Sequence, residues 1–102
     1  MSTLSPISKR LKEARETAGL SQRQLGIEAG IDEFSASARM NQYETGKHTP
    51  DFLTLKNIGK ILNVPVAFFY TEDNQLAELL VIYESLNRDT RKKLCHYVAN
   101  LA

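Results

Sequence analysis

The chain has few of the features that mark a secreted or membrane protein. Its only cysteine among 102 residues is Cys95, so no internal disulfide can form. The first ten residues hold no apolar signal-peptide core, and no apolar run approaches the roughly 18 residues that span a bilayer. We therefore expect a cytoplasmic protein that has no membrane partner.

A strong charge of one sign is also missing. The formal net charge is +1, although 25% of the residues are charged. Domains that bind nucleic acid are often strongly basic. Any basic surface on this chain must therefore come from the placement of its charges rather than from their sum.

Catalytic and metal-binding constellations are not evident either. Cys95 and His96 are adjacent, but adjacent residues on a helix point in different directions and no second pair of ligands exists. We expect a packed thiol and a surface imidazole there. Paired carboxylates, a phosphate-binding glycine loop and a nucleophile–base pair are absent from the sequence. The sequence thus predicts no enzyme, no cofactor and no metal.

Residues that favour helices, and apolar residues at helical spacing, occur along the whole chain. No segment alternates apolar and polar residues for long, so we expect an all-α fold. Helix starts are predicted at Ser5, Ser21, Asp32 or Ser35, Thr49, Pro65, Asp73 and after Asn87. Predicted stops are Gly19, Gly30, Gly46 and Asn63. Ser21 and Gln24 have the spacing of a capping box.

The segment 21–50 reads as two short helices joined by a turn and followed by a basic loop. On the second helix, an inner stripe of Ala36, Met40 and Tyr43 can dock on the bundle. Arg39, Asn41 and Gln42 then lie on other faces. Arginine can form a bidentate pair with guanine, and Asn or Gln with adenine. This pattern is typical of a helix that reads the major groove of DNA.

At these residues the chain resembles the lambda-repressor-like helix-turn-helix family, also called the Cro or XRE family. The similarity covers Ile7–Tyr70 and is carried by RLKEARETAGLSQRQL, the turn residue Gly30, NQYETGKHTP and LKNIGKILNVPVAFFY. It implies a five-helix DNA-binding bundle. We expect this domain to span residues 1–72 and a C-terminal helical hairpin to span residues 73–102.

The resemblance also implies roles for individual side chains. Arg15 and Glu44 match the partly buried ion pair that ties the first helix to the end of the third. Base contacts are expected from Ser37, Ala38, Arg39, Asn41 and Gln42. Backbone phosphate contacts are expected from Gln22, Lys47 and His48, and by their charge from Arg10 and Arg23.

One departure from the family concerns the turn before the reading helix. The interval from Gly30 to Glu44 is about four residues longer than the family's usual spacing, and the extra residues fall near Asp32–Ser35. They either lengthen the turn or extend the helix by about one turn.

The C-terminal hairpin either covers the bundle or pairs two copies of the chain. We favour a homodimer, with Leu79, Tyr83, Leu94, Val98 and Leu101 at its interface, because a small reader gains affinity and site length by dimerising. About 30 residues are too few for a ligand-binding domain, so no small-molecule ligand is expected. The predicted function is a DNA-binding transcriptional regulator, a repressor, on an inverted-repeat operator of double-stranded DNA. The alternative is a protein-interaction module with an antitoxin-like or adaptor role.

Overall fold

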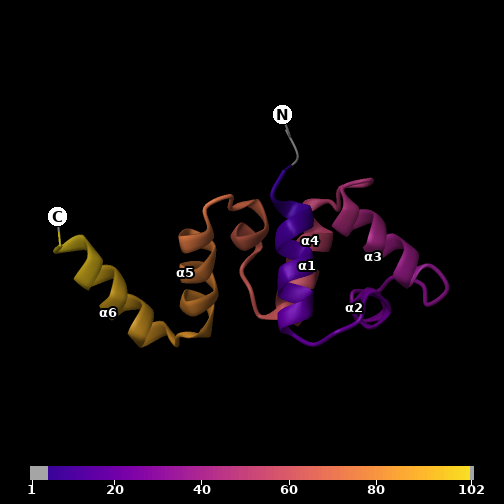
Figure 1. Cartoon of the computed structure of the whole chain (residues 1–102). Helices are drawn as coiled ribbons and strands as arrows, with labels where there is room; N and C mark the ends of the chain where they lie inside the picture. Colours follow the sequence, from indigo (N-terminus) through magenta and orange to yellow (C-terminus); the bar gives the residue numbers. More distant parts are fainter. Residues whose placement is uncertain (1–4, 102) are drawn as a thin grey trace.

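The computed structural model describes residues 5–101, and these residues form an all-helical protein without a strand (Figure 1). The ends of the two predicted domains, at residues 1–4 and 102, lie outside the described residues. The elements are α1 Ile7–Thr17, α2 Gln22–Glu28, α3 Ala36–Thr45, α4 Phe52–Leu62, the 3-10 helix η1 Val66–Tyr70, α5 Asn74–Ser85 and α6 Arg88–Ala99.

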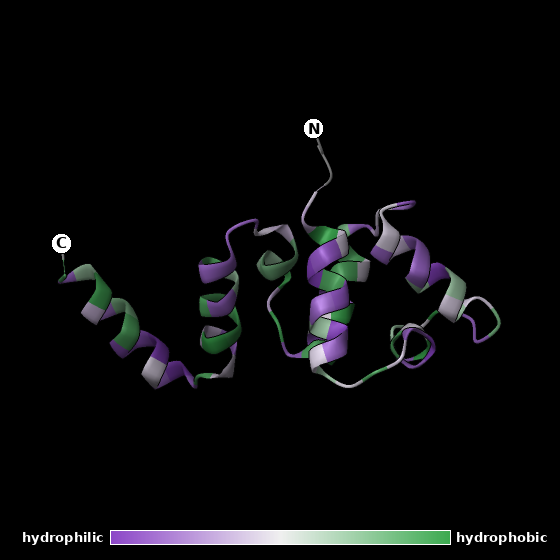
Figure 2. Ribbon diagram, viewed as in Figure 1, coloured by the Kyte–Doolittle hydropathy of each residue, from purple (hydrophilic) through white to green (hydrophobic). Residues whose placement is uncertain are grey.

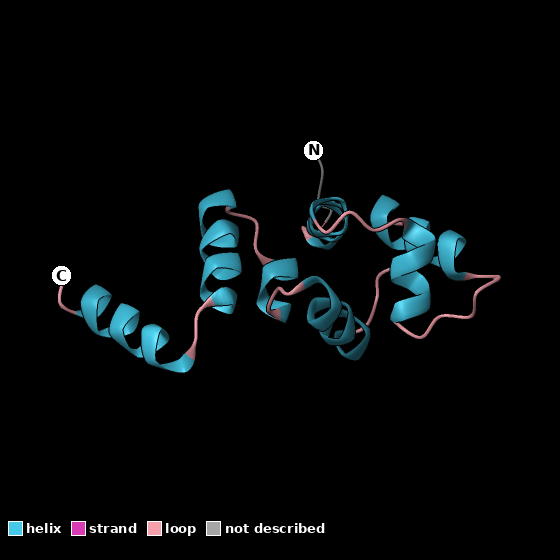
Figure 3. Ribbon diagram, turned by 90° about the horizontal axis from the view of Figure 1, so that it is seen from below, coloured by secondary structure: helices cyan, strands magenta, loops and turns pink. Residues whose placement is uncertain are grey.

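The core lies among the elements from α1 to η1. Helix α2 packs across α3, α1 packs against α3 and η1, and α4 packs against η1. The view from below shows these elements gathered on one side, with α5 and α6 extending to the other (Figure 3). The largest fully buried apolar side chains are Leu11, Leu25, Met40, Leu55, Ile58 and Phe69.

Local sequence signals set most helix ends. The Ser21 hydroxyl accepts a hydrogen bond from the N–H of Gln24, whose side chain accepts from the N–H of Ser21, so the predicted capping box is confirmed. Gly46 ends α3 at φ 81°, and Asn63 ends α4 at φ 58°. Asp73 caps α5 through the N–H of Leu76.

Two predicted helix starts are wrong. Helix α1 begins at Ile7 with Pro6 as its N-cap and no capping side chain, so Ser5 does not cap it. Helix α4 is capped by Asp51, which accepts from the N–H of Thr54 at 2.8 Å, rather than by Thr49. Hydrogen bonds from Thr54 also lower the pKa of Asp51 below its ordinary value. Pro50 is buried in the preceding loop instead of opening the helix.

The two predicted C-terminal helices, α5 and α6, are both present. Helix α6 points away from α5 and has no buried residue (Figures 1 and 2). The two helices are joined by Arg91, which donates to the carbonyl oxygens of Tyr83 and Glu84 at 3.0 and 2.9 Å. Since α6 packs along no other helix, Cys95 is exposed rather than packed.

Candidate DNA-binding surface

Helices α2 and α3 form a tightly packed helix-turn-helix. They are in close contact at Gly26, where a Cβ atom would lie 2.8 Å from the Cβ of Ala36 and 2.9 Å from its carbonyl oxygen. Only a glycine therefore lets α2 approach α3 this closely at Gly26. Ala36, Met40 and Tyr43 are buried as predicted, so the opposite face of α3 is the one left to solvent.

The end of α3 is fixed to α1 by an ion pair. Arg15 Nε lies 2.6 Å from Glu44 Oε2, and Arg15 Nη2 lies 3.0 Å from Glu44 Oε1. The two side chains are only 12% and 3% exposed. The hydrogen bonds to Glu44 raise the pKa of the Arg15 guanidinium, against the opposing effect of desolvation. This is the contact that the family resemblance implied.

Gln22 extends this pair toward the exposed face of α3. Its Nε2 donates to Glu44 Oε1 at 3.1 Å and to Asn41 Oδ1 at 3.3 Å. The contact to Asn41 orients that amide so that its own N–H groups point away from Gln22. A phosphate contact from Gln22 would require one of these two bonds to be released, and it remains a prediction.

The predicted base-reading residues share the exposed face of α3. Ser37, Ala38, Arg39 and Asn41 are exposed, and Gln42 is half-buried. Lys47 and His48 follow in the exposed loop after Gly46, where the N–H of His48 donates to the carbonyl oxygen of Gln42 at 3.2 Å. These seven side chains thus lie on α3 and on the loop directly after it. Their contacts to DNA remain predictions.

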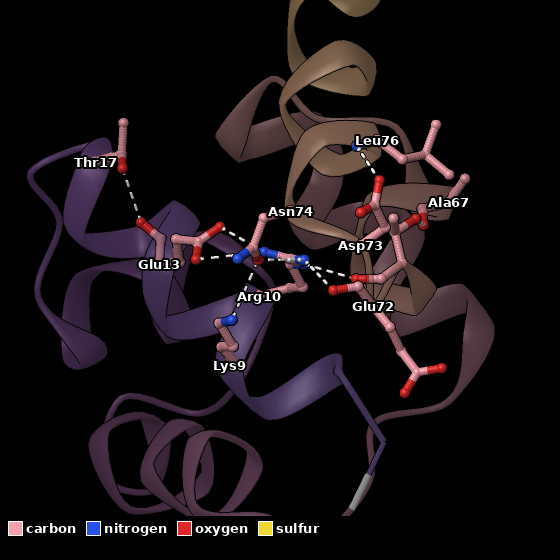
Figure 4. A network of polar contacts seen from close by, with 10 residues as sticks. Lys9, Arg10, Glu13, Thr17, Ala67, Glu72, Asp73, Asn74 and Leu76 are labelled. Atoms are coloured by element: carbon pink, nitrogen blue, oxygen red, sulfur yellow. Dashed lines mark hydrogen bonds and ion pairs between the residues drawn. The ribbon is translucent and has the colours of Figure 1, made fainter.

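Arg10 was expected to touch phosphate, and that prediction is wrong. The side chain is 2% exposed, with Nε 2.7 Å from the Thr71 carbonyl oxygen and Nη2 2.9 Å from that of Glu72 (Figure 4). It also bonds to Glu13 and to Asn74 Oδ1. Arg10 therefore joins α1 to the link between η1 and α5, and its guanidinium bonds to groups inside the protein.

The four extra residues lengthen the turn and leave the helix unextended, which settles the two alternatives that the sequence left open. Residues 33–35 form a turn and α3 begins at Ala36. Arg23 Nη2 lies 3.5 Å from Glu33 Oε2, and both side chains are more than half exposed. Such surface pairs contribute little, so Arg23 can still turn to phosphate.

The structure also places residues that sequence reasoning missed. Phe34 is 91% exposed at the tip of the lengthened turn. A groove of about 890 Å³ opens between α1, the end of α4 and α5, with Glu13, Glu78 and, from the end of α2, Glu28 among its lining residues. Phe34 could have been noticed as an aromatic residue between two polar ones in the inserted segment. The groove has no local sequence signal because segments far apart in the chain form it.

The predicted dimer residues lie on α5 and α6. Leu79, Val98 and Leu101 are about half or more exposed, whereas Tyr83 and Leu94 are half-buried. One face of the Tyr83 ring is covered by Arg91, whose guanidinium carbon lies 4.7 Å from the ring centroid. Exposed apolar side chains that the sequence did not assign adjoin them, namely Leu76, Val81, Ile82 and Tyr97.

Other kinds of site find little support in the described part of the chain. Within residues 5–101, no three His, Cys, Asp or Glu side chains are placed to hold a metal ion. None of the helices that the structure describes is long and apolar enough to cross a membrane. The helix-turn-helix surface is thus the best-defined candidate site.

Comparison with known proteins agrees with this geometry. No protein-family model matches the chain. Two HTH-type transcriptional regulators, from Sinorhizobium medicae (strain WSM419) and Rhizobium meliloti (strain 1021), are each 35% identical over 66 residues. Those residues are 65% of this chain and 45% of the relatives, so the match spans less than half of their length.

A solved structure is similar over almost the whole chain. The crystal structure of the transcriptional regulator BswR matches with a TM-score of 0.86 and 45% sequence identity, covering 93% of this chain and 94% of that one. The all-α fold is therefore confirmed, including the C-terminal helices. The chain belongs to the helix-turn-helix transcriptional regulators.

Proposed function

We propose that the chain is a sequence-specific DNA-binding repressor of the lambda-repressor-like (Cro/XRE) type, acting as a homodimer on an inverted-repeat operator. The observation that carries this proposal is the exposed row on α3, which bears Arg39, Asn41 and Gln42 while the opposite face is locked into the core. A helix held in this way can enter the major groove without losing its packing.

Different residues around this face would contact the bases and the phosphate backbone. Arg39, Asn41 and Gln42 would read base edges, with Ser37 and Ala38 beside them, because their side chains can pair with or pack on bases. Lys47, His48, Arg23 and Gln22 would bind backbone phosphate and set the register. Glu44 and Arg15 would hold the end of the reading helix at a constant angle.

A dimer is supported by the apolar side chains that α5 and α6 leave exposed. Besides the predicted interface residues, the groove beside α5 presents Glu28 and Glu78 together with the Arg10–Glu13 pair, whereas α6 exposes the basic residues Arg88, Lys92 and Lys93. The acidic residues of the groove and the basic residues of α6 would attract each other if α6 of one copy lay near the groove of a second copy. The residues up to 72 would then read DNA and those from 73 would pair the copies.

DNA binding and gene regulation can be tested one after the other. Operator selection from random DNA, followed by footprinting, should yield two inverted half-sites about 34 Å apart, centre to centre. A promoter fusion that carries this operator should be silenced by the protein and released by the Gln42→Ala variant. This function would place the protein in the cytoplasm, where the DNA is. Activation instead of silencing would contradict the repressor role but not the DNA binding.

The second candidate is a protein-interaction module with an antitoxin-like or adaptor role. The near-neutral net charge and the exposed apolar residues of α5 and α6 favour it. Pull-down and gel-shift measurements on the same preparation separate the two functions. A stoichiometric protein partner without any DNA shift at low salt would support the module over the regulator.

A further inference from the structure

The lengthened turn before α3 presents a large aromatic side chain to solvent. Phe34 is 91% exposed, compared with 65% for Tyr97 and 57% for Phe52. Phe52 and Tyr97 lie on helices, whereas Phe34 stands at a turn tip next to the proposed reading helix. Single exposed apolar side chains are common on protein surfaces, so it is the position of Phe34 beside the proposed reading helix that suggests a binding role.

The turn that carries Phe34 is held in place by hydrogen bonds. The N–H of Phe34 donates to Asp32 Oδ2 at 3.1 Å, and the N–H of Ser35 donates to the Asp32 carbonyl oxygen at 2.9 Å. Glu33 also lies 3.5 Å from Arg23 on α2, although this exposed pair contributes little. Phe34 is therefore presented at a defined place, with little conformational freedom left to lose on binding.

Phe34 lies directly before the N-terminal end of α3. The next residue, Ser35, is the N-cap of α3, and its carbonyl oxygen accepts from the N–H of Arg39 at 2.8 Å. The N-terminal end is the end that a recognition helix directs at bases. Phe34 therefore stands beside the proposed base-reading residues.

The chemistry of the turn favours a base edge over the DNA backbone. Asp32 and Glu33 directly precede Phe34 and would repel phosphate, and the phenyl ring itself can donate no hydrogen bond to phosphate. In the major groove the one apolar feature of the base edges is the 5-methyl group of thymine.

We propose that Phe34 packs against the 5-methyl group of a thymine in each operator half-site and makes the protein prefer thymine at that position. This inference rests on the proposed function. It assigns the four extra residues a role in specificity, adding a contact beyond the end of α3.

The test is a thymine-to-deoxyuridine scan of the selected operator, read by fluorescence anisotropy with the full chain. Deoxyuridine keeps the hydrogen-bonding edge of thymine and removes only the methyl group. At one position in each half-site, this replacement should weaken wild-type binding about fourfold, the effect of one buried methyl group. The Phe34→Ala variant should bind the parent operator more weakly and lose all sensitivity at that position.

Matched variants separate this contact from general damage. Phe34→Leu keeps an apolar side chain and should retain part of the methyl sensitivity. Tyr70→Ala removes an aromatic ring that is 48% exposed in η1, outside both proposed surfaces, and should leave the scan unchanged. Unchanged thermal unfolding of the Phe34 variants would verify that the fold is intact.

Failure of the inference is distinguishable from failure of the proposed function. If wild-type protein binds no DNA, the proposed function fails and the inference fails with it. If wild-type protein binds its operator but the Phe34→Ala variant shows the same deoxyuridine profile, the inference alone is overturned. Unchanged DNA binding by Phe34→Ala together with a lost protein partner would also overturn it, in favour of a protein contact.

Discussion

Arg15 and Glu44 form a two-pronged ion pair that fixes the C-terminal end of α3 to α1. The Nε–Oε2 and Nη2–Oε1 distances are 2.6 and 3.0 Å, and both side chains are almost completely shielded from water. Gln22 joins the same carboxylate to Asn41 on the exposed face. The pair therefore supports the geometry of the candidate site as well as the stability of the fold.

Replacing Glu44 by Ala should lower the free energy of unfolding by about 3–5 kcal/mol, because the guanidinium of Arg15 would remain buried without its partner. Urea denaturation followed by circular dichroism measures this change. The matched control is Glu33→Ala, which breaks the exposed pair with Arg23 and should cost less than about 1 kcal/mol. Equal losses in the two variants would contradict the structural role of Glu44.

Arg10→Met should destabilise the protein and loosen α5, since the buried guanidinium bonds to the carbonyl oxygens of Thr71 and Glu72 before that helix. Arg10→Lys should recover little, because a single ammonium group cannot reproduce the fork of donors. Hydrogen exchange should show faster exchange in α5 for both variants. Loss of DNA affinity with unchanged stability would contradict this structural role and would indicate that Arg10 binds phosphate.

Gly26→Ala should cost about 1–3 kcal/mol of stability, although alanine favours helices more than glycine does. The new Cβ would meet the Cβ, the carbonyl oxygen and the Cα of Ala36 at 2.8, 2.9 and 3.0 Å. Adding Ala36→Gly removes only the first contact, so the double variant should remain destabilised. A Gly26→Ala variant as stable as the wild type would show that α2 and α3 are less closely packed than described.

Val98→Glu should convert a dimer to a monomer, because it places a carboxylate on the apolar face of α6 that we propose is covered by a second copy. Sedimentation equilibrium measures the change, and operator affinity should fall in parallel. Ala99→Glu adds the same group on the other side of the helix and should leave the association intact. A wild-type protein that is monomeric at micromolar concentration would contradict the dimer.

Local signals made much of the fold predictable from sequence. The capping box of Ser21, the left-handed residues Gly46 and Asn63, and the buried stripe with Met40 lie where the sequence placed them. These features depend on neighbours in the chain. The family resemblance added the Arg15–Glu44 pair, a contact that no local pattern could have found.

The features that sequence reasoning predicted wrongly or missed are set by tertiary contacts. Arg10 carries a charge that suits phosphate, but the loop after η1 surrounds it with carbonyl oxygens from residues about 60 positions away. The packed thiol predicted at Cys95 is exposed, because an apolar stripe on α6 such as that of Val98 and Leu101 does not specify whether it meets its own chain or another. The close approach at Gly26 was missed because a glycine inside a helix does not reveal its neighbour.

Whether α3 and the loop after it bind an operator is tested by measuring DNA affinity at several salt concentrations. The logarithm of the association constant should fall linearly with the logarithm of salt concentration. Lys47→Ala should weaken all sequences alike and reduce the slope by about 1, whereas Gln42→Ala should cost about 1–3 kcal/mol and relax preference at one base pair. Salt-independent binding, or no binding to any selected DNA at low salt, would contradict the account.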